Sequence, residues 1–313
     1  MRRWLALPTC WALLITACGS TTSTPTTTTG ATFQKSIGDE VPADIKAKKA
    51  LQIGTDATYA PNEFIDPETG QIRGWDIDLG VAIGTVIGVP FRFNNADFSS
   101  IVPDIGTRYD VGLSSFTPTA VREKTVDFVT YYQAGESWII KTGGPRVTGP
   151  ADMCGQTVAV QTGTVEEADA YGYMGKMPDG STIKGDANHC KAAGKGDITV
   201  HSFTKQTDAD ADLLAGHASI GWSDQPVSNY QAKNSNGKEQ ISGQPCSVAP
   251  YGIALPKGSG LIKAFQDALK YLIDNGFYAK ILKAWAVDSG AIPSSGVSLN
   301  VNSSGGPSCV PSY

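Results

Sequence analysis

Arg122 carries the side chain in this sequence that is best suited to binding a carboxylate. Its planar guanidinium can form two parallel hydrogen bonds with a carboxylate group, and it follows residues 117–119, a predicted helix start. Free N–H groups at a helix start attract anions, so this turn is a candidate anion site. The alternative is a surface ion pair between Arg122 and a neighbouring acid, Glu123 or Asp127.

Asp224 is the candidate partner for a positively charged group. It ends Ile220–Asp224, which has the pattern of a buried strand running into a loop. A molecule that carries both a carboxylate and an ammonium must find an opposite charge for each when both leave water. Arg122 and Asp224 together therefore predict a site for a zwitterion, unless Asp224 is an ordinary turn or surface residue.

The loop at residues 56–63, together with Phe98, offers contacts for the side chain of such a molecule. Tyr59 and Phe98 can sandwich an aliphatic, amide or guanidinium group. Asp56 and Glu63 on the same loop would favour a cationic side chain, whereas Asn62 with a water molecule would suit an amide. The alternatives are that the acids cap a local turn and that the rings belong to the core.

These residues are distributed over two series of alternating strands and helices. The first series predicts strands at 49–55, 89–93 and 109–113, with helices at 79–87 and 98–105 between them. The second predicts strands at 156–160, 198–203, 218–222 and 247–255, with helices at 165–171 and 208–215, then helices at 261–275 and 278–285. Such alternation is typical of parallel sheets with flanking helices, which bind ligands where strands end.

The N-terminus has the pattern of a secretory signal. Arg2 and Arg3 precede an apolar run from Trp4 to Ala17, which is short for a membrane span. Cys18 follows small residues in a pattern that resembles a bacterial lipobox, so we expect lipid attachment at Cys18. The alternative is an ordinary signal that is cleaved nearby.

The charge of the chain excludes one large class of partner. Removing residues 1–17 would remove Arg2 and Arg3 and change the formal net charge from −5 to −7. A mildly acidic surface with only 3 His gives no positive field for phosphate groups, so we expect no nucleic-acid partner. No later segment is apolar enough to predict a membrane span.

Cys154, Cys190, Cys246 and Cys309 follow Cys18, and an even number favours disulfides in an oxidising compartment. Four cysteines allow three pairings. The position of Cys154 and Cys190 at the edges of one predicted lobe favours their pairing, which leaves Cys246 with Cys309. A metal site is the alternative, but no Cys-x-x-Cys pair is present and His189 is the one nearby partner, so we expect neither metal nor cofactor.

Several motifs resemble the bacterial extracellular solute-binding proteins of family 3, which bind polar amino acids. Residues 74–79 are similar to the family pattern of Gly, large apolar, acid, apolar, acid, apolar, with Trp75 bulkier than the usual Phe or Tyr. Residues 126–132 are similar to its exit toward the hinge, with Thr130 replacing the usual Pro. Further matches lie at the following segments: 97–103, 109–122, 161–164 and 251–254. The resemblance extends over about residues 50 to 286.

The resemblance implies an α/β, two-lobed periplasmic-binding-protein fold of type II. Each lobe would be a mainly parallel sheet flanked by helices, with two crossover strands as the hinge. The expected division is a signal peptide at 1–17, a lipid anchor and Thr/Ser/Pro-rich tether at 18–42, lobe 1 at 43–136 and 248–288, lobe 2 at 137–247, and an irregular tail at 289–313.

The resemblance also implies a ligand site shared by the two lobes. Arg122 would bind the carboxylate of the amino acid, and Asp224 and Ser114 would bind its ammonium group. The backbone at Gly163 and Thr164 would close over the ligand from a second helix start. The full set of expected ligand contacts is Asp56, Tyr59, Asn62, Glu63, Trp75, Phe98, Ser114, Ser115, Thr117, Arg122, Gly163, Thr164 and Asp224.

The function that follows is an extracytoplasmic, lipid-anchored, monomeric receptor for a polar amino acid, with an ABC permease and its ATPase as partners. The first alternative is a cleft enzyme of the dehydratase or lytic type, with Glu166 as its general acid. His189, His201 and His217 lie outside the matched motifs, and no nucleophile and base pair is present, which argues against catalysis. The second alternative is an amino-acid sensor, whose usual transmembrane and signalling segments are not found before Tyr313.

Overall fold

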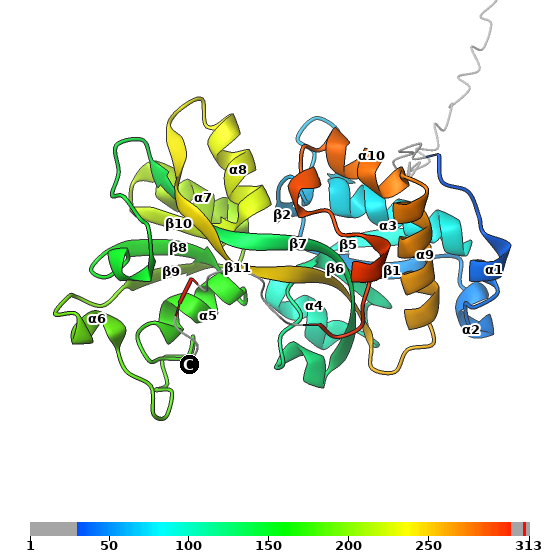
Figure 1. The fold of residues 1–313 in the computed structure, drawn as a ribbon, viewed down its shortest axis with the longest axis horizontal. Coiled ribbons are helices and arrows are strands. Elements are labelled where there is room, and N and C mark those ends of the chain that lie inside the picture. The colour runs from blue at the N-terminus through cyan, green and yellow to red at the C-terminus, as the bar shows by residue number, and fades with distance from the viewer. Residues whose placement is uncertain (1–29, 302–308, 311–313) are drawn as a thin grey trace, which may run out of the picture.

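The computed structural model describes residues 30–301 and 309–310. Two lobes lie side by side and are joined by two long strands, β7 (Val126–Lys141) and β11 (Glu239–Pro256), which run through the middle of the molecule (Figure 1). These strands pair antiparallel over most of their length. Because both continue from one lobe into the other, all large strands belong to one eight-stranded sheet with the order β5-β1-β6-β11-β7-β10-β8-β9.

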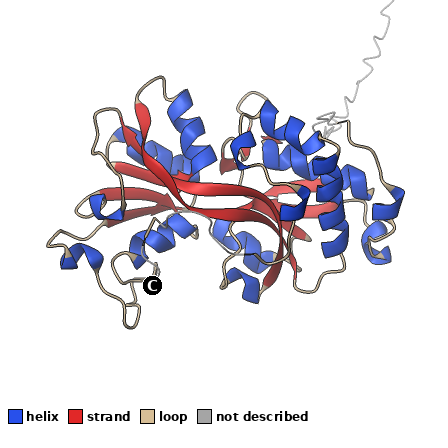
Figure 2. Ribbon diagram, in the orientation of Figure 1, coloured by secondary structure: helices blue, strands red, loops and turns tan. Residues whose placement is uncertain are grey.

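The first lobe forms around a short parallel sheet. Its strands are β1 (Leu51–Thr55), β5 (Phe91–Asn95) and β6 (Val111–Phe116), with β1 parallel to both of its neighbours. Its helices are α1 (Lys35–Gly38), α2 (Ala43–Lys46), α3 (Trp75–Ile87), α4 (Phe98–Asp104), α9 (Ile262–Asp274) and α10 (Phe277–Ala284). The apolar faces of α3 and α9 pack on the sheet and form its main core, as the helices around the central strands in Figure 2 show.

The second lobe repeats this arrangement around the other ends of the long strands. Its strands are β8 (Thr157–Gln161), β9 (Thr199–Phe203) and β10 (Ile220–Asp224), with β8 parallel to both of its neighbours. Its helices are α5 (Val165–Gly172), α6 (His189–Ala192), α7 (Gln206–Ala215) and α8 (Gln225–Asn234). Trp138 and Trp222 pack with ring centroids 5.7 Å apart inside a separate core.

A three-stranded sheet, β2-β3-β4, brings polar residues to the edge of the first lobe that faces the second. It consists of β2 (Thr58–Tyr59), β3 (Glu63–Ile65) and β4 (Ile72–Arg73). Gly74 joins it to α3 with φ 138°, a conformation that favours glycine. A Cβ atom at Gly74 would collide with the backbone of Asn62, so glycine is required where the two elements meet.

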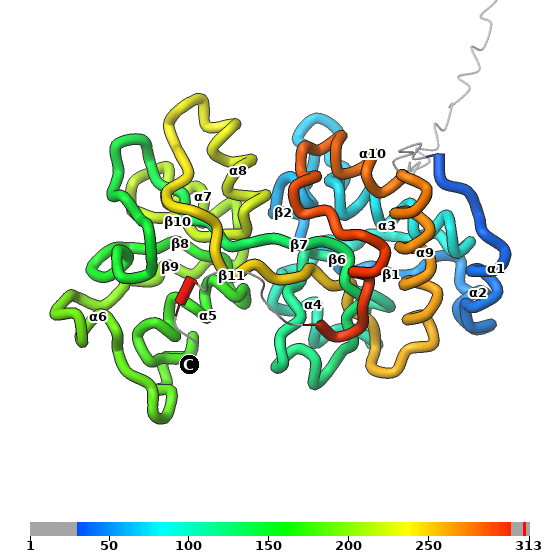
Figure 3. Tube along the Cα trace, viewed as in Figure 1, coloured from blue at the N-terminus to red at the C-terminus, as the bar shows by residue number. Residues whose placement is uncertain are grey.

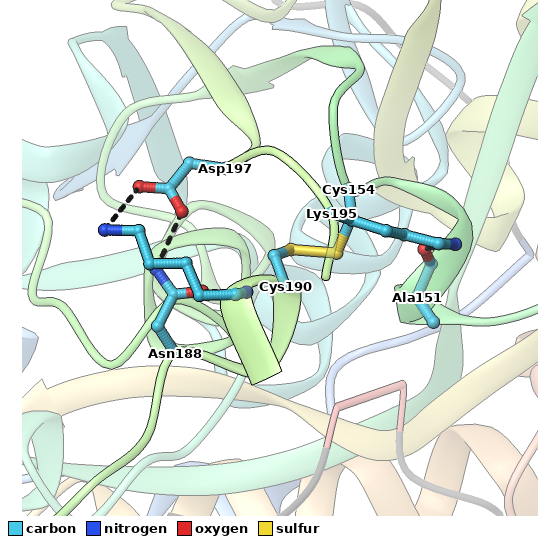
Figure 4. The surroundings of a disulfide bond; sticks show 7 residues. Ala151, Cys154, Asn188, Cys190, Lys195 and Asp197 are labelled. Atoms are coloured by element: carbon cyan, nitrogen blue, oxygen red, sulfur yellow. Dashed lines mark hydrogen bonds and ion pairs between the residues drawn. A yellow bond between two sulfur atoms is a disulfide. The ribbon is translucent and has the colours of Figure 1, made fainter. Parts of the chain in front are cut away.

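The disulfide pairing that we favoured is confirmed. Cys154 bonds to Cys190 and Cys246 bonds to Cys309. Figure 4 shows the first bond between the segment before β8 and the short helix α6. This bond holds the start of α6 on the second core, because Cys190 is fully buried there.

The C-terminal segment continues beyond α10 along the first lobe and reaches the second. Its 3₁₀ turns are η3 (Asp288–Gly290) and η4 (Ser294–Gly296). The backbone of Thr130 then donates to Ser298, and the backbone of Asn300 donates to Phe128. Figure 3 shows this red segment against the first lobe and residues 309–310 in the second, where Cys309 and Val310 enter the core.

Most predicted elements are present within a few residues of their expected ends, but three features differ. The helix expected after residues 117–119 is a single 3₁₀ turn, η1 (Arg122–Lys124), because the chain enters β7 at once. Helix α8 was not predicted, since Pro226 and polar residues hide its apolar face. The third is β7 (Val126–Lys141), which the periodicity of the sequence did not identify, although the resemblance predicted a crossover hinge strand in this region. None of the described helices is long and apolar enough to cross a membrane.

Candidate functional site

A pocket lies where strand ends of the two lobes meet, the position at which α/β proteins bind small ligands. We call it the interlobe pocket. Its lining residues are Asp56, Tyr59, Glu63, Phe98, Ser114, Ser115, Thr117, Arg122, Gln161, Thr164, Val165, Glu166 and Asp224. The loops after β1 and β6 supply it from the first lobe, and those after β8 and β10 supply it from the second.

Arg122 points its guanidinium into this pocket. One terminal nitrogen donates to the Thr117 carbonyl at 2.7 Å, and the other donates to the Gly163 carbonyl of the second lobe at 2.9 Å. The guanidinium carbon lies 5.3 Å from the centre of the Phe98 ring and 5.9 Å from that of Phe116, so the aromatic faces support the cation. Burial lowers the pKa of Arg122 to about 10, and the side chain remains protonated at neutral pH.

Asp224 reaches the pocket from the opposite lobe. It ends β10 and precedes α8, where Pro226 occupies the first turn of the helix. Tyr59 donates its hydroxyl to Asp224 Oδ2 at 3.0 Å, and the Asp224 backbone N–H donates to the same hydroxyl at 3.0 Å. Burial raises the pKa of Asp224 to about 6, although hydrogen bonds and the charge of Arg122 oppose the rise.

Asp56 closes another side of the pocket by bonding to both lobes. Its Oδ2 accepts from the Phe98 backbone N–H at 2.9 Å and from Gln161 Nε2 of the second lobe at 2.8 Å. Its Oδ1 accepts from the hydroxyl of Thr58 at 2.6 Å. Burial raises the pKa of Asp56, and these hydrogen bonds act in the opposite direction.

Ser114 and Ser115 form the floor of the pocket at the end of β6. The Ser114 hydroxyl accepts from the Asp56 backbone N–H at 2.9 Å and donates to Glu63 Oε1 at 2.7 Å. Ser115 has φ 51°, a left-handed conformation that is uncommon for residues other than glycine. Asn62 Nδ2 donates to the Ser115 hydroxyl at 2.9 Å. The floor is therefore fixed by buried polar side chains beneath it.

Glu166 is a buried carboxyl group at the N-terminal turn of α5, directly beside the other acids of the pocket. Burial and then the charge of Asp224 raise its pKa well above the usual range. Its Oε1 is buried and has no hydrogen-bond partner among the described residues. Burial and the neighbouring acid therefore favour the protonated form of Glu166, and its side chain lines the pocket as a candidate ligand contact.

Ten of the thirteen expected contacts line the interlobe pocket, and three do not. Trp75 is fully buried in the first core and donates its Nε1 to Asn62 Oδ1 at 2.7 Å, so both side chains lie beneath the pocket. Gly163 uses its backbone N–H on Glu167 Oε2 at 2.7 Å and presents its carbonyl to Arg122. The Gly163 backbone N–H is therefore used within the first turn of α5, and its carbonyl forms a contact between the lobes.

Three lining residues were outside the predicted set of contacts: Gln161, Val165 and Glu166. Gln161 lies in a motif that carries the family resemblance, and Glu166 was considered only as an acid catalyst. The signal that identifies all three is their position at the end of β8 or in the first turn of α5, where a parallel sheet places its ligands.

The match to known proteins covers both lobes. Residues 51–288 match the family described as bacterial extracellular solute-binding proteins, family 3. The chain is 34% identical over 254 residues to the arginine-binding protein ArgT of Corynebacterium glutamicum, an alignment that covers 80% of this chain and 79% of that protein.

Solved structures agree with this match. An ancestral arginine-binding protein bound to arginine superposes with a TM-score of 0.66 at 31% identity, over 76% of this chain and 98% of that one. The ancestral amino-acid-binding protein AncCDT-1, described as a precursor of cyclohexadienyl dehydratase, superposes with a TM-score of 0.65 at 27% identity, over 77% of this chain and 97% of that one. These likenesses confirm the predicted periplasmic-binding-protein fold. The protein belongs to the bacterial extracellular solute-binding proteins of family 3.

Proposed function

We propose that this protein is the substrate-binding component of an ABC importer and that it captures a cationic L-amino acid in the interlobe pocket. The observation that carries the proposal is that Arg122 and Asp224 line the same pocket from opposite lobes. Arg122 would bind the carboxylate of the ligand and Asp224 its ammonium. Only closure of the lobes brings both charges to one small molecule, so ligand binding would stabilise the closed state.

The balance of charges in the pocket favours a ligand with a second positive charge. Four carboxyl groups line the pocket, from Asp56, Glu63, Glu166 and Asp224, against the single guanidinium of Arg122. Burial is the main cause that raises the pKa values of these carboxyl groups. No lysine and no second arginine is among the described residues that line the pocket. A guanidinium or ammonium on the ligand side chain would supply that charge. The relatives that bind arginine support the same class of ligand.

Delivery to the transporter would depend on a membrane attachment and on two further proteins. We propose lipidation of Cys18, which lies outside the described residues, on the outer face of the cell membrane. The Thr/Ser/Pro-rich chain after it would hold a monomeric receptor near its ABC permease, and the ATPase would act through that permease. The lobe boundaries at 136 and 248 belong to this proposal. Of the expected tether at 18–42, the part from α1 to Val41 packs on the first lobe, so the tether would be the part before α1.

A thermal-shift titration of the full mature chain against the twenty amino acids, ornithine and citrulline tests the ligand class. A ligand at about 100 times its dissociation constant adds about 2.7 kcal/mol to the free energy of unfolding. We expect the largest increases in melting temperature with arginine, lysine or ornithine, and none with D-arginine as a stereochemical control. A response confined to neutral or acidic amino acids would refute the cationic assignment.

Catalysis is the second candidate, and the buried Glu166 carboxyl, whose Oε1 has no hydrogen-bond partner among the described residues and whose pKa is raised, is the observation that favours it. The likeness to a dehydratase precursor points to the same possibility. The opposed charges of Arg122 and Asp224 instead suit tight binding of a ground-state zwitterion, which does not accelerate a reaction. Incubation with arogenate or prephenate, followed by chromatography, separates the two, since product formation that Glu166→Gln abolishes would establish the enzyme.

A further inference from the structure

Ser115 forms part of the pocket floor in a backbone conformation that its neighbours must hold in place. Its φ of 51° is unfavourable for a residue with a Cβ atom. Its backbone N–H donates to Asp76 Oδ2 at 3.0 Å, and its hydroxyl lies 3.2 Å from the same oxygen. Tyr131 donates its hydroxyl to that oxygen as well, at 2.8 Å. A single oxygen of Asp76 therefore fixes Ser115 without lining the pocket itself.

Glu63 holds the neighbouring serine in a similar way. Its Oε1 accepts the hydroxyl proton of Ser114 at 2.7 Å, and this orients the Ser114 oxygen toward the backbone N–H of Asp56. Glu63 and Asp76 are both fully buried. The two serines of the floor thus depend on two buried carboxyl groups that approach from β3 and α3.

Each of these carboxyl groups has one oxygen left after the contacts to serine and tyrosine. Glu63 Oε2 and Asp76 Oδ1 are buried and accept no hydrogen bond from any N–H or hydroxyl among the described residues. Two ionised carboxylates this close would repel each other, whereas one proton shared by them makes a hydrogen bond and satisfies both oxygens. The backbone places the two carboxyl groups together, because the Asp76 N–H donates to the carbonyl of Asn62, the residue before Glu63, at 3.1 Å, and the charge of Asp76 raises the pKa of Glu63.

We propose that Glu63 and Asp76 form a proton-sharing carboxyl pair in which Glu63 positions Ser114 and the charged member, Asp76, positions Ser115 for the amino acid. This role rests on the proposed function, because the serines matter only if the interlobe pocket binds the ligand. Asp76 is a positioning residue that acts on the ligand through Ser115. Asp76 is the first acid of the Gly74–Leu79 motif, so the proposal explains why that position of the motif is acidic.

The surroundings of the pair determine which member carries the proton. Burial and then the charge of Asp76 raise the pKa of Glu63 well above its usual range. Burial also raises the pKa of Asp76, to about 7, but hydrogen bonds from Tyr131, Glu63 and Ser115 oppose that rise. Glu63 is therefore the member that carries the shared proton, and Asp76 is the member that ionises as the pH rises through about 7.

The other titratable groups that face the pair are either negatively charged when ionised or neutral. Asp56, on the loop after β1, raises the pKa of Glu63 further. The phenols of Tyr131 and Tyr132 on β7 and Tyr278 on α10 face Asp76. Protonation of Asp76 below about pH 7 would weaken its hold on Ser115, so ligand affinity should decrease as the pH is lowered through that value.

Calorimetric titration of the full mature chain with L-arginine, from pH 6 to pH 8.5, tests the pair. Asp76→Asn should weaken binding by about 10-fold to 100-fold at pH 8, because an amide oxygen is a poorer acceptor than a carboxylate for these bonds. It should also flatten the pH dependence above pH 6.5. Glu63→Gln should weaken binding less, because its amide still donates to Asp76. Asp78→Asn is the matched control, since Asp78 lies on the same turn of α3 and accepts from Trp285 Nε1 at 2.8 Å.

A second variant keeps the test informative if Asp76→Asn does not fold. Tyr131→Phe removes one hydrogen bond from the charged form of Asp76, so its pKa should rise and the pH dependence of binding should move to higher pH. Arginine binding that Asp76→Asn leaves equal to wild type, or a pH profile that Tyr131→Phe leaves in place, overturns the pair. A wild-type protein that binds no amino acid at any pH overturns the proposed function itself, a result distinct from either.

Discussion

The Tyr59 hydroxyl and Asp224 exchange two hydrogen bonds across the boundary between the lobes. The hydroxyl donates to Asp224 Oδ2 and accepts from the Asp224 backbone N–H, both at 3.0 Å. Burial raises the pKa of Tyr59 well above 10, so the phenol stays protonated and continues to donate. Tyr59 thereby orients the carboxylate that we assign to the ligand ammonium, and it does so only while the lobes are in contact.

Tyr59→Phe should weaken arginine binding by about 10-fold to 100-fold. The change removes a hydrogen bond to a charged group and leaves the Asp224 backbone N–H without its acceptor, at a cost of about 1.5 to 3 kcal/mol. Isothermal titration calorimetry measures the change. Tyr230→Phe, on the half-exposed face of α8, is the control and should bind as wild type does. Equal affinities for the two variants would contradict the role of the Tyr59 hydroxyl.

Arg122→Ala should abolish the increase in melting temperature that arginine produces. Truncation of one partner in a buried, hydrogen-bonded charge pair costs about 2 to 5 kcal/mol of binding free energy. We expect the melting temperature of the ligand-free protein to change little, because the guanidinium of Arg122 donates its hydrogen bonds to the backbone carbonyls of Thr117 and Gly163 and the backbone remains in the variant.

Arg122→Lys distinguishes the geometry of the clamp from its charge. A lysine keeps the positive charge but cannot form two parallel hydrogen bonds with a carboxylate, so binding should remain measurable and weak. Wild-type affinity in Arg122→Lys would show that a point charge suffices. An undiminished thermal shift in Arg122→Ala would contradict the carboxylate assignment.

The stability of the ligand-free protein should decrease as the pH rises from 4 to 7. A carboxyl whose folded pKa lies above its unfolded value of about 4 stabilises the fold while it is protonated. That contribution is complete below the unfolded pKa and is lost as the pH rises through the folded pKa, which is about 6 for Asp224. Glu136 and Glu166, whose pKa values burial raises well above normal, extend the loss to higher pH.

Melting curves at each pH unit from 4 to 8, with and without L-arginine, measure this effect. The ligand should restore stability more strongly at high pH, because its cations pair with carboxylates that have lost their protons. Asp224→Asn should flatten the decrease near pH 6. The lowered pKa of Asp66, about 2 beside Arg73, acts below the measured range. A ligand-free melting temperature that increases from pH 5 to 7 would contradict the buried, cation-poor pocket.

The alternation of strands and helices in the sequence predicted two α/β units, and the family resemblance predicted their arrangement as a two-lobed periplasmic-binding-protein fold. Regular elements such as α3 and α9 have long apolar faces, so their periodicity identifies them. The sequence did not show that β7 is a strand throughout, because residues 126–141 are buried on both faces and therefore do not alternate. Helix α8 is short and polar, and only its packing on β7 and β11 stabilises it.

The site was predictable to the extent that it lies at strand ends. Arg122 and Asp224 were found from their chemistry and from the motifs around them. Glu63 lines the pocket, whereas Asn62 lies beneath it. The sequence could not show which of these two neighbours faces the ligand, because successive side chains of an extended chain point to opposite sides. It also gave no sign that Asp76 and Ser115 bond to each other, since their contact depends on how α3 packs against β6.

Removing the disulfide Cys154–Cys190 should destabilise the second lobe and leave the ligand site intact. For a sequence separation of 36 residues, the loop-entropy estimate is about 4 kcal/mol. The paired change to alanine should shift the urea midpoint to lower concentration, while arginine affinity at 10 °C stays at the wild-type value. Paired replacement of Cys246 and Cys309, at a separation of 63 residues, provides the comparison. An unchanged urea midpoint would show that Asn188 and Asp197 already hold the α6 loop by their 2.8 Å hydrogen bond (Figure 4).

Gly163→Ala should weaken ligand binding by obstructing closure of the lobes. A Cβ atom at Gly163 would lie 2.8 Å from Ser99 Cβ on α4 of the other lobe, closer than carbon atoms approach without a shift. The φ of +83° at Gly163 adds strain of about 1 to 2 kcal/mol, which is present whether the lobes are open or closed. Small-angle scattering should therefore show a smaller decrease in radius of gyration on addition of arginine, together with a weaker affinity.

Ser99→Gly in the Gly163→Ala background separates the two effects. It removes the Ser99 Cβ atom from the contact between the lobes but leaves the backbone strain at residue 163. If obstruction dominates, the double variant should recover part of the affinity and most of the compaction. Gly155→Ala is the matched control for strain, because Gly155 has φ +79° and a Cβ atom there would meet nothing within 4 Å. Equal loss of arginine affinity in Gly155→Ala and Gly163→Ala would assign the effect to the strained backbone and contradict the proposed steric role of the Gly163–Ser99 contact in closure.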